Sequence, residues 1–506
     1  MSFLGNIRQN FNNSQNTSRG LYLGTPEAEG ETRIGQSLLD FFEDYMHIVQ
    51  DIKNGKFIIT GRKGAGKSAI VKFFKDNSSE ENELYSCKAT HLDVVFEKAI
   101  QIEGSYNKDT NSLLYEWIIL TKFVKMLLDT RDVCTTNEYK ALIQFQKKNS
   151  GLLNVDEWKT MSFESSDSRM VNFSPLKSIF NAEIGKSIRT NGIKASFIAF
   201  IPALRDIVVR MLHFQGLEKY DFMVMFDDLD INFKLNRPED RIRILDLVRI
   251  TRDYNTQYLA GTKGRVLIFL RDDVSDQLNA TEADKNKLFT SYETRISWYD
   301  HLDIDNEERC LLRKFINKRI QLAFQSLDRD CDEKDPWKSL VNNTPCKEYN
   351  NRSAFKFILE FTFYLPRDLL YVFKDLENKD LRIPLQPYDV KNLLKEYVKR
   401  KKTEILDELV IQFDDSNNAT NQLMAVLKEL SRYNNYSMKE VLDCLNSYGL
   451  NDDVFSMLID YNLLIPKDSK GNLYFKYREE QIYGDMDDYV FTLPKCLYHS
   501  FYPNKI

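Results

Sequence analysis

The sequence predicts an α/β fold in which a parallel β-sheet is covered on both faces by helices. Short apolar runs at 57–60, 222–226 and 266–270 indicate buried strands, and 84–95 and 294–298 are further candidates. Between these runs, apolar residues recur at helical spacing. Apolar strands that alternate with helices are typical of parallel sheets buried on both sides.

Length and composition limit the class of protein. A chain of 506 residues is too long for one hydrophobic core, so two or three domains are expected. Hydrophobic residues make up 42% and charged residues 29%, as in globular proteins. No apolar run reaches the roughly 18 residues that a membrane span needs, and the polar start MSFLGNIRQN lacks the features of a secretory signal. We therefore expect a cytoplasmic protein with no membrane partner.

The cysteines and the net charge argue against several kinds of site. The seven cysteines are scattered without a CxxC pair, which favours packing over zinc binding or disulfides. The five histidines are also far apart, and no nuclease or Ser/His/Asp set is evident. A formal net charge of −5 argues against wholesale coating of nucleic acid, although a local basic patch could still bind it.

Changes in pattern along the chain predict four regions. The stretch between Lys67 and Asp227 is longer than a few strand-helix crossovers require, which indicates an insertion. After about residue 300 the pattern becomes helical, and the polar run DDSNNATN marks a further break. The expected regions are a mobile polar lead-in (1–36), the sheet domain (37–300) with its insertion (131–195), a helical domain (301–413) and a last domain (414–506).

The last domain has the pattern of a winged helix. Three short helical patterns occur at 422–431, 437–445 and 452–461. They are followed by LLIPKDSKGNLYFKYR, a hairpin signal with its turn at 468–472. Three helices and a β-wing predict a winged-helix module.

One motif carries a specific chemistry. GRKGAGKS, from Gly61 to Ser68, matches the G-x-x-x-x-G-K-[ST] pattern of phosphate-binding loops in the strand-loop-helix context that such loops need. We call residues 61–68 the glycine loop. Its glycines let backbone N–H groups curve around phosphates, and the helix that follows presents its positive dipole end. The expected contacts to bound ATP are Gly61, Arg62, Lys63, Gly64, Ala65, Gly66, Lys67, Ser68 and Ala69.

Lys67 and Ser68 have expected roles in this site. Lys67 should reach the β- and γ-phosphates, and the Ser68 hydroxyl should ligate Mg²⁺. Asp227 follows the apolar run FMVMF and suits Mg²⁺ binding through water, while Asp228 is placed to orient and deprotonate the attacking water. Alone, DDLD would more often be a turn or a helix cap, but together with the glycine loop it predicts an ATPase site.

Arg271 ends the next apolar run, RVLIFLR. Ligands of open parallel sheets bind at the carboxyl ends of the strands, so Arg271 could sense the γ-phosphate. An ion pair with Asp272 or Asp273 is an equally good interpretation.

The order GRKGAGKS, FDDLD, FLRDDV, TRISW and FYLPRDLL resembles bacterial AAA+ ATPases of the origin-recognition and STAND-like kind, over roughly residues 25–480. The resemblance implies ATP and Mg²⁺ as ligands, and a helical lid followed by a winged helix. It also implies that Arg271 is the first sensor and that Arg367, in LPRDLL, is the lid arginine that contacts nucleotide. Without it, Arg367 is a charged residue at the start of a helix. An arginine finger acting in trans is implied as well, with Arg295 as a weak candidate.

Three functions are consistent with these motifs. The first is an ATP-gated switch that forms homo-oligomers, and the resemblance implies a role in phage or mobile-element defence with a separate effector protein. Many vigorous AAA+ motors carry Asp-Glu where this chain has Asp227-Asp228, and the shorter side chain predicts slow turnover. The second function is a DNA-binding loader or initiator that uses its winged helix. The third is a nucleotide-binding scaffold with little turnover.

Charge bears on the DNA-binding alternative. The basic run 399–402 could contact phosphates, but a solvated helix end that compensates its dipole is also consistent with it. The expected recognition helix, 451–460, carries three aspartates and no Lys or Arg, so phosphates would repel it. The wing contributes the cations Lys467, Lys470, Lys476 and Arg478.

Overall fold

A computed structural model places most of the chain in two compact units. The structure describes residues 17–30, 38–76, 87–93, 108–130, 135–148, 170–172, 194–196, 201–217, 220–229, 237–279, 283–300, 306–413, 416–478 and 485–506. The sheet unit comprises Met46–Arg62 and Lys67–Ile296. The helical unit comprises Ser297–Ile506, the tip of the glycine loop (Lys63–Gly66) and the described residues up to Tyr45.

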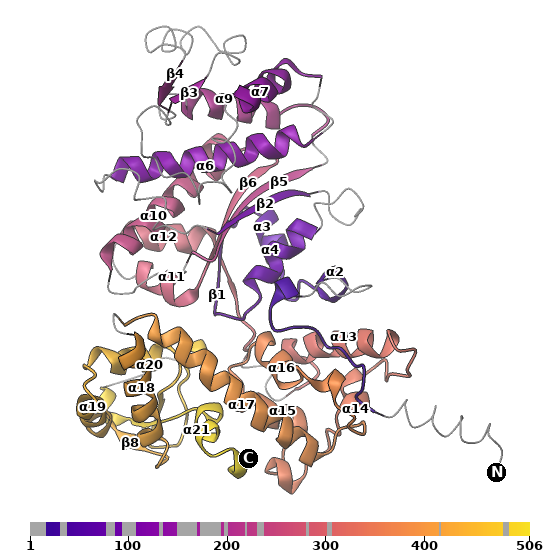
Figure 1. Ribbon diagram of the computed structural model, residues 1–506, viewed down its shortest axis with the longest axis vertical. Helices are drawn as coiled ribbons and strands as arrows, with labels where there is room; N and C mark the ends of the chain where they lie inside the picture. Colours follow the sequence, from indigo (N-terminus) through magenta and orange to yellow (C-terminus); the bar gives the residue numbers. More distant parts are fainter. Residues whose placement is uncertain are drawn as a thin grey trace, which may run out of the picture. The chain divides into compact units, whose positions relative to one another are not determined.

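The sheet unit contains a five-stranded sheet with the order β2-β5-β6-β1-β7, in which every pair of neighbours is parallel (Figure 1). This confirms the predicted α/β class. The predicted strands are also present, apart from small shifts at their ends. The strands are β1 (Ile58–Gly61), β2 (Cys87–Asp93), β5 (Asp221–Asp227), β6 (Gly264–Leu270) and β7 (Glu293–Ile296).

Helices pack on both faces of this sheet, which explains why its strands are apolar on both sides. Figure 1 shows α4 on one side and α10, α11 and α12 on the other. The described helices of this unit are α3 (Ile48–Lys53), α4 (Lys67–Asp76), α6 (Lys108–Leu128), α7 (Asn137–Lys148), α9 (Ile201–Leu212), α10 (Pro238–Asp253), α11 (Asp272–Asn279) and α12 (Ala283–Tyr292). A π-helix, Tyr254–Tyr258, continues α10.

The predicted insertion at 131–195 lies largely outside the described residues. Its described parts are the helix α7 and a two-stranded antiparallel sheet of β3 (Met170–Asn172) and β4 (Lys194–Ser196).

The helical unit is built around the long helix α17, which packs against α16, α18 and α21. Because α17 contacts helices on both sides of residue 414, the expected boundary there does not separate compact units. The α-helices of this part are α2 (Leu38–Phe41), α13 (Leu311–Gln325), α14 (Pro336–Leu340), α15 (Ala354–Leu359), α16 (Pro366–Val372), α17 (Pro387–Val410), α18 (Ser416–Leu430), α19 (Met438–Ser447), α20 (Asp453–Asp460) and α21 (Lys495–Phe501).

The expectation of a mobile lead-in is wrong for residues 17–30. Ser18 is fully buried, and its hydroxyl donates to the carbonyl of Lys379 at 2.6 Å. Leu21 and Leu23 are buried, and the Arg319 guanidinium donates to the carbonyl of Leu23 at 3.0 Å. The leucines explain the difference, because they give this polar segment enough apolar surface to pack.

The described residues of the last domain form four α-helices, α18 to α21, and a small antiparallel sheet with the order β8-β10-β9. The first three of these helices correspond to the three predicted helical patterns. The strands of the sheet are β8 (Tyr436–Ser437), β9 (Ile465–Lys467) and β10 (Val490–Thr492). The predicted turn is present, with Gly471 in the left-handed region and the Asp468 N–H donating to the carbonyl of Asn472. The two arms of the hairpin are joined by a bridge from Lys467 to Leu473, and the Tyr474 N–H donates to the carbonyl of Pro466 at 2.9 Å. The more extensive partner of β9 is β10, which the sequence did not predict.

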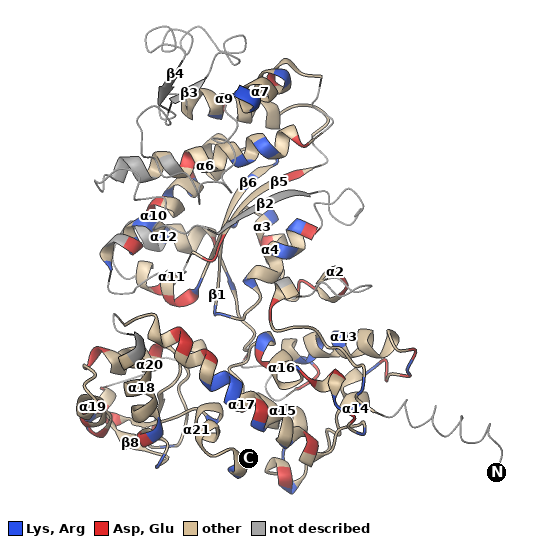
Figure 2. Cartoon of the chain, viewed as in Figure 1, with Lys and Arg blue, Asp and Glu red and all other residues tan. Residues whose placement is uncertain are grey.

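The basic run 399–402 lies inside α17 and not at its end, so the helix-end interpretation is wrong. Most cations of the run contact other side chains of the protein. Lys401 is buried between Asp368, at 3.0 Å, and Glu404, at 3.1 Å. Arg400 pairs with Asp375, and the Lys402 ammonium lies 4.9 Å from the centre of the Phe501 ring. Lys399 alone in this run is exposed. Figure 2 shows the basic residues of α17 interspersed with acidic ones.

Within the described part of the chain, no helix combines the length and apolar character required to cross a membrane.

The burial of Lys401 makes a prediction about stability. Lys401→Ala leaves the buried Asp368 without its cation, and we expect the free energy of unfolding to fall by about 3 kcal/mol or more. The exposed Lys399→Ala is the matched control on the same helix, with an expected change within about 0.5 kcal/mol. Urea titrations followed by tryptophan fluorescence measure both, and equal effects would contradict the ion-pair assignment.

Candidate functional site

The glycine loop connects β1, which lies between β6 and β7 in the sheet, to the first turn of α4. Gly64 and Gly66 have φ values of +82° and +108°, which L side chains rarely adopt, so these two positions require glycine. The Lys67 ammonium donates to the carbonyls of Gly61 at 2.7 Å and Arg62 at 3.2 Å. These two hydrogen bonds connect the end of the loop, at Lys67, to its first two residues. Ser68 is half-buried and follows it on α4.

Strand register brings the predicted acidic and basic residues to the loop's edge of the sheet. Thr60 pairs with Leu270, and Phe226 pairs with Ile268. Since β6 lies between β1 and β5, the residues that follow these three strands emerge side by side. Arg271 and the Asp227-Asp228 pair thus share one edge with the start of the glycine loop.

The two aspartates differ sharply in environment. Asp227 is the last residue of β5 and is only 4% exposed. Asp228 is exposed and has a φ of +51°. A left-handed residue that is not glycine costs roughly 1 kcal/mol, a conformation that Asp tolerates better than most residues. The chain therefore turns immediately after the buried carboxylate. Sequence reasoning missed Asp93, which ends β2 in register with Asp227.

Arg271 forms a two-pronged ion pair with Asp273. Its Nε and Nη2 atoms donate to the two carboxylate oxygens at 3.0 and 2.7 Å, and both side chains are less than one-fifth exposed. Of the two interpretations of Arg271, the ion pair is therefore the one seen in the structure. A role in sensing phosphate stays a prediction.

Asp272 is a carboxylate close to the glycine loop that sequence reasoning did not single out. Burial raises its pKa, and the adjacent Asp273 raises it further. The cations Arg62, Lys67 and Arg295 oppose this shift without cancelling it.

Arg295 also pairs with Asp276 of its own chain, at 2.8 Å. Because both of these carboxylates lie in α11, Arg295 interacts with the surroundings of its own glycine loop. This arrangement gives no support to a role as an arginine finger acting in trans.

The tip of the loop is held by residues of the helical unit. The indole Nε1–H of Trp298 donates to the carbonyl of Ala65 at 2.8 Å. Arg367 lies against Gly64, since a Cβ added there would meet the Cβ and Cδ atoms of Arg367 at 3.0 Å. Lys63 lies 3.7 Å from Glu408. The resemblance therefore pointed to a residue that does contact the loop, whereas Trp298 was predicted only as a strand end.

Arg367 is fixed by acceptors on two sides. Its Nε donates to the carbonyl of Pro26 and its Nη1 to the Glu404 carboxylate, both at 3.3 Å. Burial by itself would raise the pKa of Glu404, but the charges of Lys401 and Arg367 outweigh burial and lower it. Glu404 is therefore an ionised bridge between the loop-contacting arginine and the buried Lys401.

A group of tyrosines connects this region to the last domain. The rings of Tyr299, Tyr364 and Tyr477 lie with their centroids 5.1 to 5.9 Å apart. The Arg478 guanidinium stands over them, 5.0 Å from the centre of Tyr299. We call these four residues the tyrosine cage. Tyr299 follows Trp298 directly, and Tyr364 lies three residues before Arg367, so both loop contacts adjoin the cage along the chain.

The cage also alters the expected charge of the wing. Arg478 is occupied by aromatic rings, and Lys476 pairs with Asp460 of α20 at 2.7 Å. Two of the four predicted wing cations are thereby engaged within the protein.

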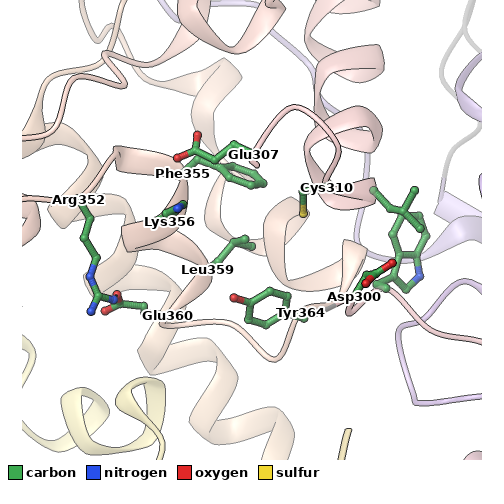
Figure 3. A pocket seen from close by; sticks show the side chains of 11 residues that line it. Asp300, Glu307, Cys310, Arg352, Phe355, Lys356, Leu359, Glu360 and Tyr364 are labelled. Carbon is green, nitrogen blue, oxygen red and sulfur yellow. The ribbon is translucent and has the colours of Figure 1, made fainter. Parts of the chain in front are cut away.

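A separate pocket lies in the helical unit, between α15 and the segment that precedes α13 (Figure 3). Its volume of about 100 Å³ is well below the several hundred Å³ of typical ligand sites. Its acids are engaged already: Glu360 pairs with Arg352, and Glu307 accepts from Ser353 and Asn343. Trp298 contributes to its lining.

The residues at the sheet edge suit a magnesium ion held jointly with phosphates. Mg²⁺ is usually bound through one or two carboxylates together with phosphate oxygens and water, which Asp227 and Ser68 could complete. In the described ranges no group of three or more His, Cys, Asp or Glu side chains could hold a metal by itself. Such a metal would therefore depend on the nucleotide.

No protein-family model matches this chain, and a search of curated proteins gives no match either.

The packing of Arg367 on Gly64 makes a prediction that needs no ligand. Gly64→Ala and Gly66→Ala each force an alanine into a left-handed φ, but only the first also drives a Cβ into Arg367. We expect Gly64→Ala to lower the free energy of unfolding by about 1–3 kcal/mol more than Gly66→Ala does, because of this overpacking. Urea denaturation of the two variants measures the difference. Equal losses would show that Arg367 does not lie against the loop.

Proposed function

We propose that the chain is an AAA+-type ATPase that binds and hydrolyses Mg-ATP and acts as a nucleotide-gated switch. The observation that carries this proposal is the strand register. It gathers the glycine loop, Arg271 and the pair Asp227-Asp228 at one edge of a parallel sheet. Ligands bind at this edge in open α/β folds.

Each residue then has a defined task in hydrolysis. Lys67 binds the β- and γ-phosphates, and the N–H groups of the glycine loop surround them. A magnesium ion held by Ser68 and Asp227 would neutralise charge on the phosphate oxygens. Asp228 orients the attacking water and accepts its proton. Its side chain is one methylene shorter than glutamate, which favours slow turnover and a long-lived ATP state.

The helical unit supplies the proposed readout. We assign α13 to α17 as the lid, with Arg367 as the lid arginine that contacts nucleotide. Its contact with Gly64, three residues from Lys67, supports this assignment. We assign residues 416–506 as the winged helix, supported by the order α18, β8, α19, α20, β9 and β10. The tyrosine cage provides a packed connection from Arg367 to this module.

The alternative of DNA loading has weaker support. Most cations of the run 399–402 contact acidic or aromatic side chains of the protein itself. In the wing, Lys476 pairs with Asp460 and Arg478 lies over aromatic rings. The expected recognition helix retains its acidic character, with Asp453 at its first turn. A winged helix that docks protein suits this charge better, consistent with a homo-oligomer or a separate effector as partner.

Two substitutions test the enzymatic part of the proposal. Lys67→Ala should abolish Mg-ATP binding measured by calorimetry, because the phosphates lose their main cation. Asp228→Asn should retain binding within a few-fold but lower the rate of phosphate release at least 10²-fold, the low end for loss of a general base. The conservative Lys67→Arg and Asp129→Asn serve as controls for charge and for an exposed carboxylate away from the glycine loop. Tight binding without turnover in the wild type would instead support the scaffold alternative.

A third variant tests the switch. With a non-hydrolysable ATP analogue and Mg²⁺, we expect the particle size measured by light scattering to increase. Arg367→Ala should bind the analogue but lose this increase, because the lid no longer contacts the nucleotide. Lys399→Ala, exposed on the same helix that carries Glu404, should behave like the wild type. An unchanged size in the wild type would remove the oligomerising switch and leave the ATPase.

A further inference from the structure

The Ala65–Gly66 peptide is the part of the glycine loop that is easiest to misorient. Gly66 has a φ of +108°, and apart from its chain neighbours no residue lies within 4 Å of the position that a Cβ would occupy. Side-chain packing therefore does not fix this residue. Glycine also has the greatest conformational freedom of all residues. A rotation of this peptide would exchange the directions of its carbonyl and its N–H.

Trp298 holds this peptide in one orientation. Its indole N–H donates to the carbonyl of Ala65 at 2.8 Å. A trans peptide is planar, and its carbonyl and N–H point in opposite directions. The N–H of Gly66 must therefore point away from Trp298. A carbonyl that turned inward would repel a phosphate, whereas an N–H attracts one.

The indole itself packs against two aromatic rings. Its ring lies 6.0 Å from that of Tyr45 and 5.6 Å from that of Phe315, both in edge-to-face geometry. The Arg319 guanidinium in turn lies over the Phe315 ring, 4.7 Å from its centre. Trp298 is thus a rigid donor and not a mobile surface side chain.

From these contacts we infer that Trp298 is a positioning residue of the glycine loop, which keeps the Gly66 N–H directed to a phosphate of the bound nucleotide. This inference rests on the proposed function. Trp298 touches neither phosphate nor metal and acts only through the Ala65 carbonyl.

Trp298→Phe removes the N–H and keeps an aromatic ring between Tyr45 and Phe315. A neutral hydrogen bond contributes roughly 0.5–1.5 kcal/mol, so we expect Mg-ATP to bind about 2- to 10-fold more weakly. Trp337→Phe is the matched control. Its buried indole donates to Asn343 at 3.1 Å in the same unit but has no contact with the loop. We expect this control to bind Mg-ATP as the wild type does, whatever it does to stability.

A second measurement uses the unaltered protein and separates positioning from simple structural support. If the indole bond favours nucleotide binding, nucleotide must strengthen that bond by the same factor. We therefore expect saturating Mg-ATP to slow hydrogen exchange of the Trp298 indole N–H, followed by NMR with ¹⁵N-labelled tryptophan. The Trp298→Phe spectrum assigns the signal, and the Trp337 indole is the internal reference.

The outcomes are distinct. No Mg-ATP binding by the wild type overturns the proposed function, and this inference with it. Binding by the wild type that Trp298→Phe leaves unchanged overturns the inference alone, as does an indole exchange rate that ignores nucleotide. Should the variant fail to fold, the exchange rate in the wild type still decides the question.

Discussion

The carbonyls of the glycine loop need hydrogen-bond donors from side chains, and this constraint shapes much of the surrounding structure. In the glycine loop, three carbonyls receive donors from side chains. Lys67 bonds to Gly61 and Arg62, and Trp298 bonds to Ala65. The first two bonds come from the sheet unit and the third from the helical unit. These bonds select one loop conformation, which the flexible glycines alone would leave undetermined. The left-handed φ angles of Gly64 and Gly66 are the backbone strain of that conformation.

A second constraint is the pairing of charges behind the loop tip. Arg367, Glu404, Lys401 and Asp368 form a continuous series of opposite charges between α16 and α17. Asp368 is fully buried, so removal of Lys401 leaves an uncompensated charge in a poorly solvated place. The orientation of Arg367 on Gly64 is therefore tied to the packing of α17, the longest helix among the described residues. Through this series of ion pairs the loop tip is connected to buried residues of α16 and α17. An arginine surrounded by solvent would not provide such a connection.

Sequence predicted well those elements whose structure is determined by residues close to one another along the chain. The apolar runs at 222–226 and 266–270 could hardly be other than buried strands, and the glycine motif requires a strand before it and a helix after it. Errors arose where distant partners decide the outcome. The run 399–402 has the appearance of a solvated basic patch, but Asp368, Asp375 and Phe501 lie far away in sequence. The hairpin signal at 468–472 predicted its turn, yet the more extensive partner of β9 is β10. Trp298 gave no signal beyond strand propensity, because a hydrogen bond to a carbonyl 233 positions away has no local pattern.

The positions of Trp298 and Arg367 are compatible with the proposed switch. Both contact the loop tip directly, and both adjoin the tyrosine cage within three residues along the chain. The rings of the tyrosine cage pack at 5 to 6 Å from one another and around the Arg478 guanidinium. Close-packed groups change arrangement in discrete steps, so a movement of one ring would shift its neighbours. A switch of the kind we propose would report whether the loop is occupied, and it would need only one change of state. The slow turnover that we propose at Asp228 would suit that task, since a partner can recognise a state that persists, whereas rapid turnover would end it.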